Sequence, residues 1–400
     1  MKRGLPMSDI SFFDSTLFQE LTDDLKHLSR FTAVYQIHAA TYEDAKKIAE
    51  GIAVEQTIEC PVILVQGTWK ETIIVGQIEE IKKSRPDYFH ATISYDPNCV
   101  GGEMTELINM LFGNSSLQPG VRLMSFELPD VMYNDYPGPK FGRMGLRELC
   151  HVDEGPIMMS AIKPLGNNSQ EFARMVYELA LGGCPIIKDD HSLYNQSYAP
   201  FEERTKACID AVNEANAKTG GHSLFIPNCT ADGFTFFERA LKAQEWGAGG
   251  IMAAPGLLGF PLIRELTKSS DFHLPVFLHP CFSGALVLSE DSGISPFCYY
   301  GQLGRLAGGD AVIFTGFGGR FAFSKDTCKR IVEGTDTTMA DLKSAFPVPS
   351  GGMSYDLFPQ MQQVYGNDAI FLVGGALQTH GSNLVENMKF YMEKIKELKR

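Results

Sequence analysis

Residues 182–190 have the sequence Gly-Gly-Cys-Pro-Ile-Ile-Lys-Asp-Asp, and this stretch decides the class of fold. A glycine pair interrupts the chain before a short apolar run, and three charged residues end that run. Such a run between turn signals is typical of a strand that is buried on both faces of a parallel sheet. The apolar residues of Gln170–Leu181 before it and Pro200–Lys218 after it recur at helical spacing. The stretch therefore predicts helix, buried strand and helix in succession.

The same alternation recurs through the C-terminal part of the chain. Eight short apolar runs alternate with amphipathic stretches within about 220 residues. That count predicts a (β/α)8 barrel, because the rival doubly wound sheet rarely keeps eight units so evenly. The runs are Ile157–Lys163, Cys184–Lys188, Ser223–Pro227, Gly250–Ala254, Pro275–His279, Ala311–Phe314, Pro347–Gly351 and Ile370–Gly374.

The N-terminal part of the chain lacks this regular alternation. Strands are predicted at Phe31–Ile37, Cys60–Val65 and Phe89–Ser94. Helices are predicted at Tyr42–Gly51 and Glu103–Phe112. This mixture indicates an α+β domain of the ferredoxin-like kind over residues 1–150, followed by the catalytic barrel over residues 151–400.

Charge and cysteine content narrow the class of protein. The formal net charge of −13 argues against a nucleic-acid partner, whereas backbone amides can still hold a small phosphorylated ligand. No stretch reaches the roughly 18 apolar residues of a membrane span, and the N-terminus lacks the apolar segment of a signal peptide. Nine dispersed cysteines without a CxxC pair indicate reduced thiols rather than structural zinc. We expect a cytoplasmic protein with no membrane partner.

Barrel enzymes carry their chemistry at the carboxyl ends of their strands, so the polar residues there are the candidates. The second barrel strand ends in Lys188-Asp189-Asp190-His191. One interpretation is an ion-paired strand end. The other is a divalent cation held by a carboxylate, the imidazole and a carbamate formed on the lysine. The spacing alone leaves both open.

Other strand ends carry candidates with equally open interpretations. Lys163 is either a group that polarises a carbonyl and moves a proton, or a solvated loop lysine. His279 is either catalytic or structural. Ser350-Gly351-Gly352 and Gly374-Gly375 follow strands seven and eight, where backbone amides of barrels often bind phosphate. Gly316–Arg320 has the composition of a mobile lid that carries a cation, Arg320, or of a plain flexible loop.

In this order, these residues resemble the large chain of ribulose-bisphosphate carboxylase (RuBisCO), and more closely the non-carboxylating form IV RuBisCO-like proteins. The resemblance covers nearly the whole chain. The segments that carry it are Ile162–Gly166 (IKPLG), Gly182–Asp190, Pro347–Gly352 (PVPSGG), Val373–Ala376 (VGGA) and the turn Pro137–Pro139.

The resemblance implies a role for each candidate and an obligate homodimer or a multiple of dimers. Lys188 would be the carbamylated lysine, Asp190 and His191 the metal ligands, and Lys163 the lysine that assists enolisation. His279 matches the family's strand-five histidine. The phosphate-binding loops would comprise Ser350, Gly351, Gly352, Gly374 and Gly375, and the residues contributed across the dimer interface would be Glu55 and Asn114.

Departures from the family pattern argue against CO2 fixation. Carboxylases carry glutamate where this chain has His191, and a second lysine where it has Leu165. Their Thr-Gly-Thr-Trp segment is replaced by Ile58–Pro61. The imidazole also bears on the metal, since Mg²⁺ prefers oxygen ligands and imidazole suits Mn²⁺ or Zn²⁺ better. We expect a divalent cation, Mg²⁺ first, bound together with the carbamate or not at all.

The step that the family shares is to form or consume an enolate beside a carbonyl. We expect a decarboxylase or transcarboxylase for a 3-oxo sugar acid phosphate of the 3-oxo-isoapionate 4-phosphate type, because His191 makes the site less negative. One alternative is a methionine-salvage enolase or isomerase acting on 5-methylthioribulose 1-phosphate or its diketo derivative. However, such enolases keep glutamate at the position of His191. A non-catalytic scaffold or redox-response protein is the other alternative.

Overall fold

A computed structural model describes residues 29–319 and 323–398. Within these ranges the chain divides into two units. The first holds the described residues up to Val121 together with Glu127–Pro129, and the second holds the rest. Helix α4 (Gly142–Cys150) falls in the second unit, and the domain boundary predicted near residue 150 stays a proposal.

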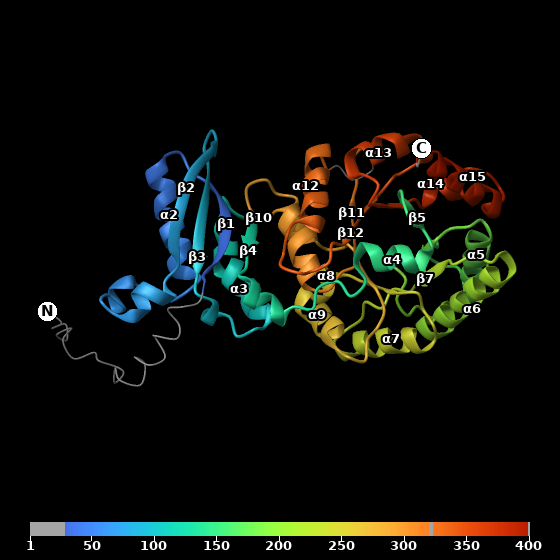
Figure 1. Cartoon of the computed structure of the whole chain (residues 1–400), viewed down its shortest axis with the longest axis horizontal. Helices are drawn as coiled ribbons and strands as arrows, with labels where there is room; N and C mark the ends of the chain where they lie inside the picture. Colours follow the sequence, from blue (N-terminus) through green and yellow to red (C-terminus); the bar gives the residue numbers. More distant parts are fainter. Residues whose placement is uncertain (1–28, 320–322, 399–400) are drawn as a thin grey trace. The chain divides into compact units, whose positions relative to one another are not determined.

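The first unit is built on three antiparallel strands. Strand β1 (Phe31–His38) pairs with β3 (Tyr88–Tyr95), which pairs in turn with β2 (Gln77–Arg85). Alternate side chains from Phe31 to Ile37 are wholly buried, as a strand with one face on a core requires. Helix α2 (Tyr42–Glu55) lies against the three strands (Figure 1). The helix predicted at residues 42–51 is therefore confirmed and extends one turn further.

One predicted strand in this unit is wrong, and one strand was missed. The run at Cys60–Val65 forms only the short helix η2 (Val62–Leu64), and Ile63 and Leu64 are exposed. Strand β2 has the sequence QIEEIKKSR, and its charged side chains point to solvent. Charged residues are common on sheet edges, so apolar periodicity does not find such a strand. The other helices of the unit are η3 (Lys70–Ile74), η4 (Pro97–Cys99), α3 (Met104–Phe112) and η5 (Asn114–Leu117).

The second unit contains all eight predicted barrel strands. They are β5 (Ile157–Ala161), β6 (Ile186–Lys188), β7 (Leu224–Ile226), β8 (Ile251–Ala253), β9 (Val276–Leu278), β11 (Ala311–Thr315), β12 (Phe346–Ser350) and β13 (Ile370–Leu372). They pair in parallel in the orders β13-β5-β6-β7 and β8-β9-β11-β12. A parallel bridge from Asn228 to Met252 links β7 to β8, and β12 contacts β13. Side chains from all eight strands share one apolar core, as in a packed TIM barrel.

Helices follow the strands in alternation, and several of them line the outside of the barrel in Figure 1. Helices α5 (Ser169–Leu181) and α6 (Phe201–Thr219) confirm the two predicted next to β6. Strand β4 (Val121–Glu127) has its two end residues in the first unit and Arg122–Phe126 in the second. The remaining elements of the second unit are η6 (Asp130–Asp135), α7 (Phe234–Glu245), α8 (Pro255–Leu258), α9 (Phe260–Lys268), α10 (Gly284–Val287), β10 (Gly293–Ile294), η7 (Phe297–Leu303), α11 (Gly304–Leu306), α12 (Lys325–Asp336), η8 (Tyr355–Leu357), α13 (Phe358–Tyr365), α14 (Gly375–Gln378) and α15 (Leu384–Glu397).

Helix α4 is attached to the amino ends of the barrel strands by one buried carboxylate. Asp310, which directly precedes β11, accepts hydrogen bonds from the backbone N–H groups of Phe141 and Gly142, both at 2.7 Å. Its second oxygen accepts the N–H of Val276 at 2.9 Å, where β9 begins. Burial raises the pKa of Asp310 to about 6, although these three bonds favour the ionised form. The carboxyl ends of the strands, on the opposite side of the barrel, carry the candidate site.

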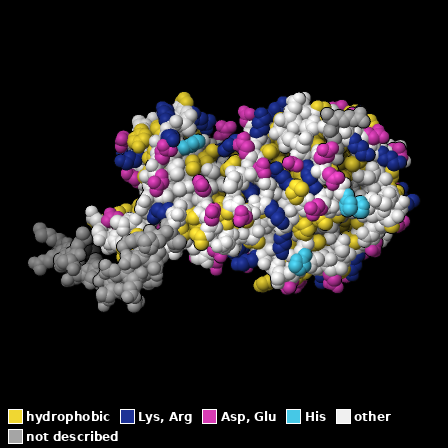
Figure 2. Space-filling model, viewed as in Figure 1, with side chains coloured by type: hydrophobic (Ala, Val, Ile, Leu, Met, Phe, Trp, Pro, Cys, Tyr) yellow, Lys and Arg dark blue, Asp and Glu magenta, His cyan; other side chains and the backbone are white. Residues whose placement is uncertain are grey.

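The surface and the thiols bear on the other expectations. On the face seen in Figure 2, acidic and basic side chains are interspersed rather than gathered into a field of one sign. All nine cysteines lie in the described ranges and none is paired in a disulfide. No helix among the described residues is both long and apolar enough to cross a membrane.

Candidate active site at the carboxyl ends of the barrel strands

Lys188 is the last residue of β6, and its side chain is buried in the barrel mouth. The residue is 2% exposed, and its ammonium donates to the carbonyl oxygen of Asp189 at 2.8 Å. Burial lowers the pKa of Lys188 to about 8, and the positive charge of Lys163 acts in the same direction against the carboxylate of Asp190. An amine with this pKa is partly uncharged near neutral pH.

Asp189 points away from the mouth and has a structural partner that sequence reasoning missed. Arg204 of α6 donates to both carboxylate oxygens, at 3.3 and 3.1 Å, and neither side chain is exposed to solvent. The backbone N–H of Asn228, just after β7, donates to the same carboxylate at 3.0 Å. Arg204 lies on the buried face of α6 at helical spacing from Phe201 and Cys208. An arginine on an otherwise apolar helical face could have indicated a buried ion pair from the sequence.

Asp190 is the carboxylate at the centre of the candidate site. Lys163, after β5, lies 2.6 Å from one oxygen, and His191 Nδ1 lies 3.1 Å from the other. Burial alone would raise the pKa of Asp190, but these two hydrogen bonds and the charge of Lys188 lower it far below its ordinary value. Asp190 is therefore a carboxylate at any working pH, and it brings the candidates from β5 and β6 together.

His279, at the end of β9, stacks on His191. The two imidazole rings are nearly parallel, with an angle of 7° and 4.6 Å between their centres. The backbone N–H of Cys281 donates to Nδ1 of His279 at 3.1 Å. Burial and the charge of Lys188 lower the pKa of His279 well below its ordinary value, so its imidazole is neutral. Because Nδ1 accepts a hydrogen bond, the proton of the neutral ring resides on Nε2, which is then a donor.

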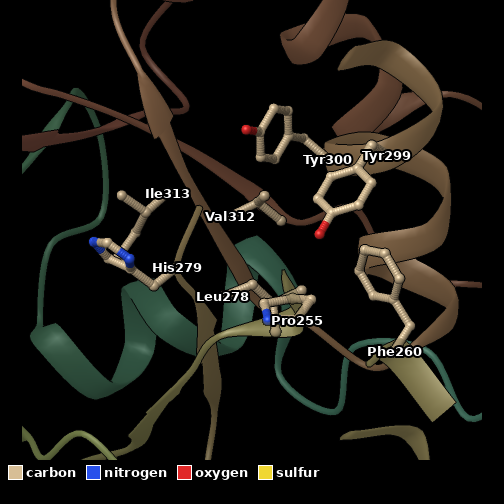
Figure 3. A pocket seen from close by; sticks show the side chains of 8 residues that line it. All are labelled: Pro255, Phe260, Leu278, His279, Tyr299, Tyr300, Val312 and Ile313. Atoms are coloured by element: carbon tan, nitrogen blue, oxygen red, sulfur yellow. The ribbon is translucent and has the colours of Figure 1, made fainter. Parts of the chain in front are cut away.

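A small apolar cavity lies behind His279, between β9, β11 and η7. Figure 3 shows His279, Leu278, Val312 and Ile313 on one side and aromatic rings on the other. Its volume of about 10 Å³ has room for roughly one water molecule. The cavity is thus part of the support of the histidine and too small for a sugar phosphate. The rings are those of Phe260, Tyr299 and Tyr300.

The two glycine segments follow β12 and β13 as predicted. Gly351 and Gly352 have φ angles of 91° and 87°. Residues with a side chain rarely adopt such angles, so the backbone turn at these two positions favours glycine. A β-carbon at Gly374 would meet the Lys163 side chain at 3.7 Å. The end of β13 therefore borders the Lys163–Asp190 pair, whereas Gly375 begins the short helix α14.

Two predicted site residues lie in the first unit and contact each other. The Asn114 amide donates to the Glu55 carboxylate at 3.0 Å and also to Glu59. Gln56, which the sequence analysis did not single out, holds the backbone around Asn114 in place. Its buried amide accepts the N–H of Ser115 at 3.0 Å and donates to two carbonyls at the end of α3. Arg320 lies outside the described residues.

The donor set after β6 suits a divalent cation on one condition. Within residues 29–319 and 323–398, no three His, Cys, Asp or Glu side chains gather in a way that would hold a metal ion. Asp190 offers oxygen and His191 nitrogen, and a carbamate on Lys188 would be the third ligand. The lowered pKa of Lys188 leaves part of the amine uncharged, and only the uncharged amine adds CO2. The residues therefore fit a cation if Lys188 is carbamylated.

Much of the sequence of the barrel unit matches a known protein family. Residues 144–386 match the family described as ribulose bisphosphate carboxylase large chain, catalytic domain. The chain belongs to this family. The resemblance to RuBisCO-like proteins and the barrel fold predicted from the eight apolar runs are confirmed.

Similar members of the RuBisCO large-chain family are named as enzymes or as RuBisCO-like proteins. The 5-methylthioribulose-1-phosphate isomerase of Rhodospirillum rubrum is 34% identical over 92% of this chain and 96% of its own. The 2,3-diketo-5-methylthiopentyl-1-phosphate enolase of Geobacillus thermodenitrificans is 32% identical over 88% of each chain. The crystal structure of a RuBisCO-like protein from Rhodopseudomonas palustris is 31% identical, with a TM-score of 0.81 over 93% of this chain and 99% of that one.

Proposed function

We propose that this RuBisCO-like protein is an enolate-forming enzyme that removes or transfers the carboxylate of a phosphorylated 3-oxo sugar acid, of the 3-oxo-isoapionate 4-phosphate type. One observation carries the proposal. Lys163, Lys188, His191 and His279 surround a single carboxylate, that of Asp190. In the proposed carbamylated site, the positive charges of a divalent cation and Lys163 outweigh the negative charges of the carbamate and Asp190. Such a site suits a substrate that brings a carboxylate as well as a phosphate.

The proposed chemistry assigns each group a task. The turns at Gly351–Gly352 and Gly374–Gly375 bind the phosphate through backbone amides. The bond between C2 and the carboxylate breaks, CO2 leaves, and the electron pair forms an enolate. Lys163, held by Asp190, donates to the developing oxyanion and then supplies the proton that returns the enolate to a ketone. His279 donates through Nε2 to the same or the neighbouring oxygen.

The metal belongs to the proposal as well. Carbamylated Lys188, Asp190 and His191 would hold a divalent cation, Mg²⁺ or, given the imidazole, Mn²⁺ or Zn²⁺. Such a cation, when bound, stabilises negative charge on the substrate oxygen. Metal and carbamate are expected together, since an uncarbamylated Lys188 leaves too few ligands.

The comparisons favour a second candidate. Two relatives at 34% and 32% identity are named as an isomerase and an enolase of methylthio-sugar phosphates. Applied to this chain, the same site would abstract a proton from 5-methylthioribulose 1-phosphate or its diketo derivative, without loss of CO2. The two candidates share the phosphate loops and Lys163, and they differ in whether a carbon–carbon bond breaks.

We also propose that the active enzyme is a homodimer, or a multiple of dimers, in which Glu55 and Asn114 of one subunit complete the site of the other. The barrel unit carries exposed apolar side chains in the segment that follows β9, including Phe282 at 75% exposure and Leu288 at 64%. The loops after β8 and β9 that carry such residues touch, since a β-carbon at Gly256 would meet Cys281 O at 2.5 Å. A second subunit that covers this patch would remove apolar surface from water.

The experiment is a panel of 3-oxo sugar acid phosphates and methylthio-sugar phosphates, assayed for CO2 release and for solvent deuterium exchange with Mg²⁺, Mn²⁺ or EDTA. CO2 release that needs the cation and is lost in Asp190→Asn supports the decarboxylase. Exchange without CO2 release would assign the isomerase or enolase instead. The matched control is Lys206→Met on the outer surface of α6, set against Lys163→Met. The absence of both CO2 release and deuterium exchange on every substrate would favour a non-catalytic scaffold.

A further inference from the structure

The segments that follow β11 and β12 are packed backbone against backbone. The N–H of Gly316 donates to the carbonyl of Ser350 at 2.8 Å, and the Ser350 hydroxyl donates to the carbonyl of Phe314 at 2.9 Å. A β-carbon at Gly319 would overlap the carbonyl oxygen of Gly351. The position of the Gly351–Gly352 turn therefore depends on where residues 316–319 lie.

Tyr365, the last residue of α13, holds the segment after β11 from behind. It is 2% exposed, and its hydroxyl accepts the backbone N–H of Phe317 at 3.3 Å. Its ring packs on the rings of Phe314 and Phe317, with centres 5.9 and 5.6 Å away. A β-carbon at Gly316 would come within 3.0 Å of the hydroxyl. Tyr365 thus combines a close steric fit with one polar contact to the segment.

The polar contact stays the same over the working range of pH. Burial raises the pKa of the Tyr365 hydroxyl far above its ordinary value, so the group remains protonated. A protonated hydroxyl can accept the N–H of Phe317 and donate elsewhere at the same time. Cys328 of α12 lies beside the Tyr365 hydroxyl. The hydroxyl therefore lies where α12, α13 and the segment after β11 meet.

We propose that Tyr365 is a positioning residue, which through Phe317 and Gly319 sets the geometry of the Gly351–Gly352 turn and hence the affinity for the substrate's phosphate group. The inference rests on the proposed function, in which this turn binds phosphate. Tyr365 itself does not touch substrate. It acts because a shift of residues 316–319 shifts the Gly351 carbonyl and the amides beside it.

The test is Tyr365→Phe, which removes the hydroxyl and keeps the ring. We expect inorganic phosphate to bind about fivefold more weakly in calorimetry, as the loss of one hydrogen bond implies. KM for the phosphorylated substrate should rise by a similar factor while kcat changes less than about twofold. Gly319→Ala, which forces the two segments apart, should weaken phosphate binding further. Tyr177→Phe removes a hydroxyl bonded to Lys218 on the outer helices and is the matched control.

The outcomes separate this inference from the proposed function. Unchanged phosphate affinity in both Tyr365→Phe and Gly319→Ala overturns the positioning role, even if thermal stability falls, and leaves the proposed function standing. No binding of phosphate to the wild type overturns both. Weaker phosphate binding in the two variants, with the control unchanged, supports the positioning role whichever phosphorylated substrate is turned over.

Discussion

Four consecutive residues at the carboxyl end of β6 have separate tasks because their surroundings differ. Lys188 is buried and contacts a backbone carbonyl, Asp189 pairs with a buried arginine, and Asp190 faces the mouth with His191 beside it. A carboxylate in a buried ion pair stabilises the fold, because its removal would leave the partner's charge buried without a counter-charge, which costs free energy. A carboxylate that meets a half-exposed lysine, as Asp190 does, remains available to a ligand.

The first prediction concerns the buried pair. Asp189→Ala should lower the free energy of unfolding by about 3–5 kcal/mol, because it leaves the Arg204 guanidinium buried without a counter-charge. Chemical denaturation of the metal-free protein measures it. Glu202→Ala, which breaks an exposed pair with Lys206 in the same helix, is the control and should change little. Equal effects of the two substitutions would contradict the structural role of Asp189.

The second prediction follows from the pKa of Lys188. The folded value is about 8 against an ordinary 10.5, so between these values the unfolded chain binds more protons and stability rises with pH. Below pH 8 the charged lysine costs stability. Lys188→Met should therefore be more stable than the wild type at pH 7, by about 1–3 kcal/mol, and inactive. The gain should shrink from pH 8 to 10.5.

Thermal unfolding in CO2-free buffer with EDTA checks this second prediction, because it keeps Lys188 an amine. Lys206→Met, at an exposed lysine, serves as the control for the loss of a surface charge. A Lys188→Met protein that is less stable than the wild type at pH 7 would show that the buried amine stabilises the fold.

At the scale of elements, the barrel strands are short, and the residues at their ends form the candidate site and fix the strands in place. β6 has three residues, and its last residue together with the next three forms the site or its support. Such short strands need fixing at both ends. Asp310 does this at the amino end by joining α4 to the start of β9.

The third prediction is that Asp310→Ala destabilises the second unit by about 3 kcal/mol or more, because three buried N–H groups lose their acceptor. Asp310→Asn keeps the size and one oxygen, and should cost less. Denaturant unfolding followed by circular dichroism measures both. If the asparagine variant were as unstable as the alanine variant, the negative charge rather than the bonding pattern would be responsible.

At the scale of the molecule, the residues that the proposed function uses come from both units of the chain. The nitrogen-rich cluster belongs to the barrel, while Glu55 and Asn114 form a preassembled pair in the first unit. If the pair serves a partner subunit, each dimer has two composite sites. Variants in the two units then affect different halves of each site.

The fourth prediction uses that division. Glu55→Gln and Lys163→Met homodimers should each be nearly inactive, yet co-refolded mixtures should regain roughly a quarter of wild-type activity. Half of the dimers are then hybrids, and each hybrid has one intact site. The control is a mixture of Lys163→Met with Asp190→Asn, both in the barrel, which should regain nothing. Equal recovery in both mixtures would contradict the shared site.

Much of the barrel follows from local sequence, because buried parallel strands leave short apolar runs bounded by turns. All eight runs became strands, and several residues at their ends meet, as Lys163 meets Asp190 and His191 meets His279. The exposed edge strand β2 was missed and residues 60–65 were wrongly predicted as a strand. β2 is rich in charged residues and residues 60–65 are apolar, but neither segment shows the alternation that marks a half-buried strand. Contacts with residues distant in the sequence decide whether such segments form strands.

By itself, the sequence determined the class of fold, the family resemblance and the set of residues at the strand ends. These depend on local periodicity and motif order, which are properties of the chain alone. Only the tertiary structure decided which of two adjacent aspartates pairs with Arg204, how far burial lowers the pKa of Lys188, that His191 stacks on His279, and that Tyr365 packs against the segment after β11. Those outcomes depend on desolvation and on contacts between residues far apart in the chain, which no local pattern encodes.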